Sequence, residues 1–180
     1  MVALCVTSYY NKNKGVNLMN RYEGLNLEMN LMTKKRLIFT SFFILQNKMQ
    51  TLFDNQWEEI TSKQWLILMI ASAFPQPPSL TEVAAHAGCS RQNVKKIAAI
   101  LEKKGYVELV TETDMRAVRI VLTKKFHEFY QPFVEKSALG INALFGGMTN
   151  EEIETFFYLL GKLGDNVDYF TNECKTEKKK

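Results

Sequence analysis

The sequence predicts a mainly α-helical protein with one small β-wing. Two observations predict this fold class. Along most of the chain after residue 30, apolar residues recur at the three- and four-residue spacing of amphipathic helices. A single pair of short runs, near residues 105–122, alternates between apolar and polar side chains as strands do. With 180 residues, 46% of them hydrophobic and 23% charged, the chain is long enough to bury a core.

The first element of the central region is a short helix that begins after Ser79. Ser79 followed by Glu82 forms a capping box, which satisfies backbone amides that the first turn of a helix leaves unpaired. Gly88 ends this helix, because glycine adopts the left-handed backbone conformation at little steric cost. Ser90 is the expected N-cap of a second helix. The segment therefore predicts two helices joined by a glycine turn.

The second helix, over about residues 90–104, is predicted to have one buried and one outward face. Its buried stripe comprises Val94, Ile97, Ala98 and Leu101. A rotation of about 100° per residue places the opposite face on Gln92, Lys96, Ala99 and Lys103. Five Lys/Arg residues and one Glu give this segment a local charge of +4. From charge alone, a solvated amphipathic helix is the simpler interpretation. Amide and lysine side chains on one face, however, also suit the base edges and phosphates of a DNA major groove.

Two strand-like runs follow and complete a winged helix. Residues 105–110 and 117–122 alternate, and the polar residues 111–116 form the expected turn between them. At the tip of this hairpin, Arg116 suits the negative potential of a narrow minor groove. Asp114 is placed to hold that guanidinium by a charge-assisted hydrogen bond. With this second element, DNA binding becomes the favoured interpretation.

Several short runs between Trp65 and Thr123 carry a family resemblance. They are Leu80-Thr81-Glu82-Val83-Ala84, Ser90-Arg91-Gln92-Asn93-Val94, Leu101-Glu102-Lys103-Lys104-Gly105-Tyr106-Val107, and Asp114-Met115-Arg116 with Leu122-Thr123. On these runs the segment resembles the MarR family of bacterial and archaeal transcription regulators, and the Asp-x-Arg pair with the later Leu-Thr is the most specific part. The resemblance implies an obligate homodimer, a palindromic operator, and often repression that a small ligand or thiol oxidation relieves. The family usually has a glycine shortly after Leu-Thr, where this chain has Phe126.

The predicted function is sequence-specific binding of double-stranded DNA by a homodimeric transcription regulator, a ligand- or redox-responsive repressor of a palindromic operator. The residues expected to read bases are Gln92, Asn93 and Lys96, and those expected to contact phosphates are Ser90, Arg91 and Lys95. Arg116, steadied by Asp114, is the expected minor-groove contact. The alternative is a winged helix used for protein–protein assembly without specific DNA binding.

The chain is predicted to have five parts. They are an N-terminal arm over residues 1–28 (disordered, or ordered only on contact), a dimerisation helix over 29–56, the winged-helix DNA-binding domain over 57–123, C-terminal dimerisation helices over 124–174, and a basic tail over 175–180. Thr61 with Gln64 and Thr149 with Glu152 are two further capping boxes. Pro132 is expected to kink its helix or to begin a new one. The aromatic surface of the outer helices favours pairing with a second copy over a monomeric helical cap.

Two regulatory sites are also predicted. In the family that the chain resembles, an effector cavity lies between the dimerisation helices and the winged helix; the candidates here, by position, are Phe39, Phe42, Trp65 and Phe126, for which ordinary core is an equal interpretation. A small aromatic molecule is the expected effector. Cys89 begins the second helix, where the helix dipole favours a reactive thiolate, but a small core residue is the favoured interpretation.

Other chemistry has little support in the sequence. His86 and His127 are the two histidines, and no ligand cluster at metal-binding spacing accompanies them. The chain has no legible nucleophile elbow, phosphate-binding loop or carboxylate pair, so neither a cofactor nor an enzymatic activity is expected. The three cysteines are far apart, which favours a reducing cytoplasm. No apolar run approaches the roughly 18 residues of a membrane span, so no membrane association is expected.

Overall fold

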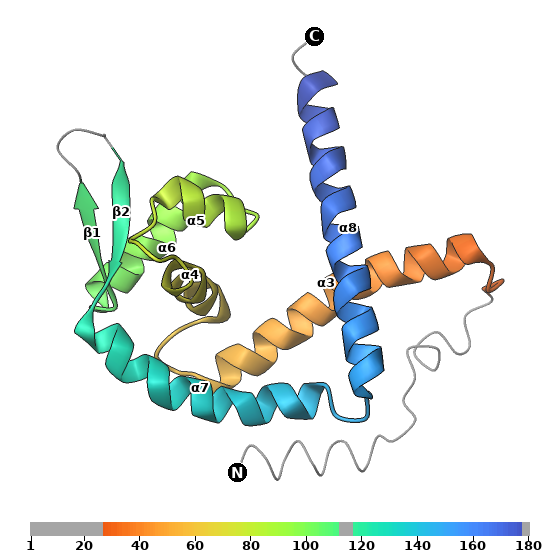
Figure 1. The fold of residues 1–180 in the computed structure, drawn as a ribbon, viewed down its shortest axis with the longest axis horizontal. Helices are drawn as coiled ribbons and strands as arrows, with labels where there is room; N and C mark the ends of the chain where they lie inside the picture. The colour runs from red at the N-terminus through yellow and green to blue at the C-terminus, as the bar shows by residue number, and fades with distance from the viewer. Residues whose placement is uncertain (1–26, 112–116, 178–180) are drawn as a thin grey trace. The chain divides into compact units, whose positions relative to one another are not determined.

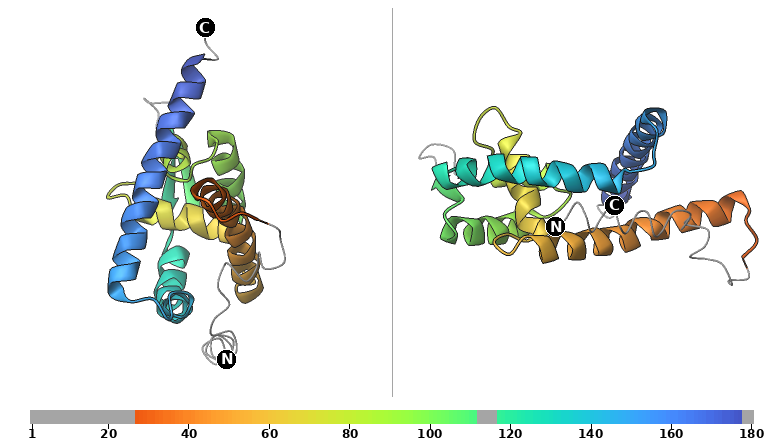
Figure 2. Two further views of the ribbon diagram at one scale, coloured as in Figure 1. Left: turned by 90° about the vertical axis from the view of Figure 1, so that its right-hand side faces the viewer. Right: turned by 90° about the horizontal axis from the view of Figure 1, so that it is seen from below.

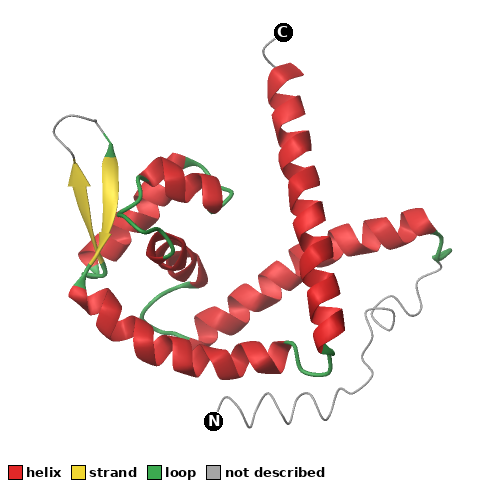
Figure 3. Ribbon diagram, in the orientation of Figure 1, coloured by secondary structure: helices red, strands yellow, loops and turns green. Residues whose placement is uncertain are grey.

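The computed structural model of the protein describes residues 27–111 and 117–177, and these residues are mostly helical (Figure 1). Figure 3 shows the two strands as one hairpin beside helical elements. This arrangement confirms the predicted mainly α-helical fold with a small β-wing. In chain order the elements are α3 (Leu31–Gln56), α4 (Ser62–Ser72), α5 (Leu80–His86), α6 (Arg91–Lys103), β1 (Val107–Thr111), β2 (Val118–Leu122), α7 (Lys124–Leu144) and α8 (Asn150–Glu177).

The described residues divide into two compact units. Residues 27–133 form the first, which contains α3 to α6, the hairpin and the first half of α7. Residues 134–177 form the second, which contains the remainder of α7 and all of α8. In the first unit, α4, α5, α6 and the hairpin pack on one another as a lobe (Figure 2). This lobe is the predicted winged helix.

The predicted capping boxes form where the sequence placed them. In each box the hydroxyl of the N-cap residue accepts a backbone amide three residues later, and the side chain at that later position accepts the amide of the N-cap residue. These bonds satisfy amides that a first helical turn otherwise leaves unpaired, so each helix begins at a defined residue. The three pairs are Thr61 with Gln64, Ser79 with Glu82, and Thr149 with Glu152.

The core of the first unit lies between α4, α5, α6, the hairpin and the start of α7. Each of these elements contributes side chains that are almost completely buried. Apolar burial of this kind is the main favourable term in folding, at roughly 1.5–3 kcal/mol for each large side chain. The largest of the buried side chains are Tyr106, Phe126, Ile60, Ile67, Leu68, Leu80, Leu101 and Ile120.

The hairpin confirms the two predicted strands. β1 and β2 pair in antiparallel register, from Val107 opposite Leu122 at the base to Thr111 opposite Val118 toward the tip. The turn that joins them, and with it the predicted minor-groove pair Asp114 and Arg116, lies outside the described residues.

The turn from the hairpin into α7 closes without the glycine that the resembled family usually has. The Thr123 hydroxyl donates to Gly105 O at 2.7 Å and accepts the amide of Phe126 at 3.3 Å, so Thr123 caps the helix. Phe126 itself is only 1% exposed and belongs to the core. Further along, α7 continues without interruption through Pro132, so no new helix begins there. Pro132 is exposed, which leaves water access to the carbonyl that the missing amide would have bonded.

Within the described ranges, no helix combines the length and the apolar character that crossing a lipid bilayer requires.

Candidate nucleic-acid interface

A tight turn sets α5 and α6 against each other. Gly88 has a φ of 60°, the left-handed conformation that favours glycine, and it directly follows the C-cap of α5. The amide of Cys89 then returns to Ala84 O at 3.1 Å, which holds the turn closed. The Ser90 hydroxyl accepts the Asn93 amide at 3.2 Å and begins α6. The local sequence therefore fixes where the second helix starts.

The helix α6 has the two faces that its periodicity predicts. Val94, Ala98 and Leu101 are completely buried, at 0% exposure each. On the opposite side, Gln92 and Lys96 are exposed. A polar and cationic face thus stands in solvent while the apolar face packs on the lobe.

The six predicted contacts on this helix come from one short segment of the chain. Each of them is exposed, and all come from the first two turns of α6 and its N-cap. The Ser90 hydroxyl already accepts the Asn93 amide. Its O–H donor and second lone pair can still bind a ligand. The six are Ser90, Arg91, Gln92, Asn93, Lys95 and Lys96.

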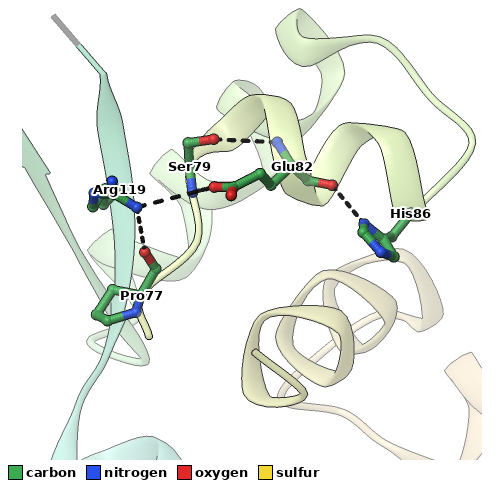
Figure 4. A network of polar contacts seen from close by, with 5 residues as sticks. All are labelled: Pro77, Ser79, Glu82, His86 and Arg119. Atoms are coloured by element: carbon green, nitrogen blue, oxygen red, sulfur yellow. Dashed lines mark hydrogen bonds and ion pairs between the residues drawn. The ribbon is translucent and has the colours of Figure 1, made fainter. Parts of the chain in front are cut away.

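Arg119 on β2 ties the hairpin to the start of α5 (Figure 4). Its Nη1 donates to Pro77 O at 2.9 Å and lies 4.0 Å from Glu82 Oε2. The Ser79 amide, which donates to Glu82 Oε2 at 2.6 Å, holds the pKa of the Glu82 carboxyl below its usual range. The Ser79 hydroxyl and the charge of Arg119 lower that pKa further. The capping box of α5 is thus part of the contact between the hairpin and the helix-turn-helix.

A second polar network fixes the base of the hairpin. The hydroxyl of the buried Tyr106 donates to the Glu59 carboxylate, in the connection between α3 and α4. Lys104 Nζ donates to Glu59 O at 2.6 Å and to Gln64 Oε1 at 3.0 Å. Lys125 Nζ donates to Lys104 O at 2.9 Å and lies 4.6 Å from the centre of the Tyr106 ring. Burial, and then the Glu59 carboxylate, raise the pKa of the Tyr106 hydroxyl.

An aromatic cluster lies where α3, α4 and α7 meet. Trp65 packs on Phe53 and Phe133, with ring centres 5.3 and 6.0 Å apart. Trp57 lies 4.4 Å from Phe133 and 6.3 Å from Phe129. The indole Nε1 of Trp65 is buried, and no acceptor for it lies among the residues that the structure describes. The cluster thus contains a buried hydrogen-bond donor that an added acceptor would satisfy.

The predicted effector residues lie in different surroundings. Trp65 belongs to the aromatic cluster just described, and Phe126 is core, stacked on Tyr130 with ring centres 5.3 Å apart. Phe39 is 66% exposed and meets Phe43 edge to face. Phe42 is half-buried on α3.

Cys89 and His86 both make contacts that help to hold the fold together. Cys89 is half-buried and packs against the core, in agreement with its interpretation as a small core residue. His86 Nδ1 lies 2.9 Å from Glu82 O, which accepts from it, and its ring meets Phe74 edge to face. Over the parts of the chain with described coordinates, no three His, Cys, Asp or Glu side chains gather as a metal site would require.

Comparisons with known proteins give the fold a name. No family model matches the sequence. A MarR protein from Peptoclostridium difficile superposes with a TM-score of 0.70 at 23% identity, over 80% of this chain and 95% of its own. PcaV from Streptomyces coelicolor, in complex with its natural ligand, gives 0.64 at 21% identity over 77% and 97% of the two chains. The S. aureus MepR–DNA complex gives 0.62 at 19% identity over 70% and 93%. The chain has the fold of the MarR family.

Within the MarR fold, the residues that sequence reasoning missed are those whose partners lie far along the chain. The sequence predicts only a strand at Arg119, whereas in the structure Arg119 binds the carbonyl of Pro77, 42 positions earlier. The partners of Trp65 in the aromatic cluster were missed too. A usable signal is the four-residue spacing of Phe129 and Phe133, which places both on one side of α7. Phe53 likewise lies four residues before Trp57, the C-cap of α3.

Proposed function

We propose that the protein is a transcription regulator that binds a palindromic operator in double-stranded DNA as a homodimer, with α6 in the major groove. The exposure of Gln92 and Lys96, on the side of α6 opposite the fully buried Val94, Ala98 and Leu101, carries this proposal. The apolar side of α6 already anchors the helix in the lobe, so the amides and cations of its outward face are available to bind a ligand. They have the chemistry that base edges and phosphates require.

Each residue of this face has a stated role. Gln92 and Asn93 present amides that pair bidentately with adenine, and Lys96 reaches guanine or a phosphate. Ser90, Arg91 and Lys95 surround the helix N-terminus, whose positive dipole end also favours a phosphate. On the wing, Arg116 enters the minor groove and Asp114 orients it, as the sequence predicts. The existence of a DNA complex of MepR, which shares the fold, supports these roles.

The apolar surface of the second unit supports the proposed homodimer. On α8, Phe157 is 74% and Phe170 69% exposed, and most of the helix is similarly uncovered. Monomeric soluble proteins rarely leave contiguous apolar patches of such extent in water. A second copy related by a two-fold axis covers the patch and also matches the symmetry of a palindrome. The residues that share one face at about 100° per residue are Phe156, Leu160, Leu163, Val167 and Phe170.

Regulation by a small aromatic effector is the second part of the proposal. The aromatic cluster around Trp65 offers ring surfaces and one buried donor, the indole Nε1. A ligand with an aromatic ring and an acceptor oxygen satisfies both. That PcaV has been described with its natural ligand supports effector binding by this fold. Repression relieved by such a ligand is favoured over a Cys89 redox response, because Cys89 packs against the core.

The test measures binding to a fluorescently labelled DNA duplex, taken from upstream of the protein's own coding sequence, at several salt concentrations. Specific binding is expected to weaken steeply with salt, by a slope that counts the phosphates neutralised. Lys96→Ala is expected to weaken binding and to lower that slope by about one, whereas Lys63→Ala, an equal loss of charge on α4, is expected to change neither. The absence of salt-dependent binding, or equal effects of the two variants, would instead favour the protein–protein assembly alternative.

A further inference from the structure

The hairpin is bonded to its surroundings along both of its outer edges. Leu109 and Ile120 are opposite one another in the register of β1 and β2. On the outer edge of β2, the amide of Ile120 donates to Pro78 O, outside the hairpin, at 2.8 Å. On the outer edge of β1, the amide of Leu109 donates to Glu102 Oε1 at 2.9 Å. The two edges are therefore held at the same level of the ladder, one by a backbone carbonyl and the other by a side chain of α6.

Glu102 is the acidic residue of a helix that otherwise carries cations. At about 100° per residue it lies on the flank of α6 with Arg91 and Lys95, about a quarter-turn from the outward face. A carboxylate there repels the phosphates that the neighbouring cations attract. Electrostatics of DNA binding alone therefore disfavours a glutamate at this position. Its bond to the strand amide gives it a different role.

We propose that Glu102 is a positioning residue that sets β1, and through it the wing, at a fixed place relative to α6. The Leu109 side chain packs against the core. Because the core is close-packed, holding the Leu109 amide in place also holds β1 and the hairpin in place. A charged acceptor makes a shorter and stronger bond than a neutral one. The bond therefore keeps the helix and the wing at the separation that simultaneous contact with two grooves needs. This role in DNA contact rests on the proposed function.

The bond itself is tested by amide hydrogen exchange of Leu109 in the full-length protein, without DNA. Glu102→Ala is expected to speed exchange of this amide about two- to tenfold, the effect of one lost hydrogen bond. Glu102→Gln retains an acceptor oxygen and is expected to restore most of the protection. Glu108→Ala removes the same charge from an exposed position on β1 and serves as the matched control. Unchanged exchange of Leu109 in Glu102→Ala, with the thermal midpoint preserved, overturns the proposal.

DNA affinity then tests whether the bond matters for binding. A charge effect and a positioning effect of Glu102 predict opposite changes in the affinity of Glu102→Ala for DNA. If the charge of Glu102 is all that counts, its removal tightens DNA binding in both Glu102→Ala and Glu102→Gln. If positioning counts, Glu102→Ala weakens binding several-fold, whereas Glu102→Gln and Glu108→Ala bind as wild type or tighter. Tighter binding by Glu102→Ala overturns the positioning role. If wild-type protein shows no salt-dependent DNA binding, the proposed function fails and the role in DNA contact with it, while the exchange measurement still decides whether Glu102 holds β1.

Discussion

The hydroxyl of Tyr106 donates a hydrogen bond to the carboxylate of Glu59, 47 residues earlier in the chain. This bond joins the base of the wing to the connection between α3 and α4. Around it, Lys104 and Lys125 bond to backbone carbonyls of the same region. The start of the hairpin is thereby fixed to the connection between α3 and α4 and to the start of α7.

Tyr106→Phe tests what this contact contributes to stability. The substitution keeps the ring in the core and removes the donor, so the free energy of unfolding is expected to fall by about 1 kcal/mol. Tyr169→Phe, on a side chain that is 64% exposed, is the control and is expected to change stability by less than about 0.5 kcal/mol. Urea unfolding of both variants and of wild type measures the difference. Equal midpoints for wild type and Tyr106→Phe would show that the bond contributes nothing.

The same pair predicts a dependence of stability on alkaline pH. The folded state raises the pKa of the Tyr106 hydroxyl, by burial first and by the Glu59 carboxylate second. In the unfolded chain this hydroxyl loses its proton near pH 10, about the usual value for tyrosine. Above that pH the unfolded state binds fewer protons than the folded state, so stability falls as pH rises. The stability advantage of wild type over Tyr106→Phe is therefore constant below about pH 10 and shrinks above it. An advantage that grows with pH contradicts this account.

Substitution of the glycine in the turn between α5 and α6 is expected to lower stability through backbone conformation alone. Gly88 has a φ of +60°, and a Cβ added there meets nothing within 4 Å. Gly88→Ala is therefore expected to cost about 1 kcal/mol through its conformation, with no contribution from a clash. Gly88→Asn is expected to cost less, because asparagine tolerates the left-handed region better than alanine. Thermal unfolding measures both, and a larger loss for asparagine would indicate that space, not φ, limits this position.

Both tryptophans of the chain, Trp57 and Trp65, lie in the aromatic cluster, so tryptophan fluorescence reports on this cluster alone. A small aromatic acid that acts as the effector is expected to raise the thermal midpoint and to change tryptophan emission at the same concentrations. Trp65→Phe, which removes the unpaired indole donor, is expected to weaken that response about five- to tenfold. A compound that releases DNA without altering tryptophan emission would locate the effector elsewhere.

Features determined by neighbouring residues could be predicted from the sequence. The three capping boxes, the glycine turn at Gly88 and the two faces of α6 depend on residues within a few positions of one another, and all of them are as predicted. The hairpin was predictable for the same reason, since its alternation is local. The fold class followed from these elements together.

The contacts that fix the wing could not be predicted, because they join segments that only folding brings together. Nothing near Tyr106 in the sequence indicates that Glu59 is its partner, and nothing near Arg119 indicates the carbonyl of Pro77. Phe126 illustrates the same limit. Periodicity identified an aromatic residue on a helical stripe, but the choice between cavity wall and core depends on which elements pack against it, and it is core.

Selection of binding sites from a random duplex library, with the full-length protein, tests the central claim most directly. Two copies of α6 and the wing are expected to enrich an inverted repeat whose half-sites lie about 10 base pairs apart, centre to centre. Gln92→Ala and Lys96→Ala are expected to relax the base preference within each half-site, and the repeat is expected to survive in both. Failure of the wild-type protein to enrich any sequence, or enrichment of a site without two-fold symmetry, would contradict the account.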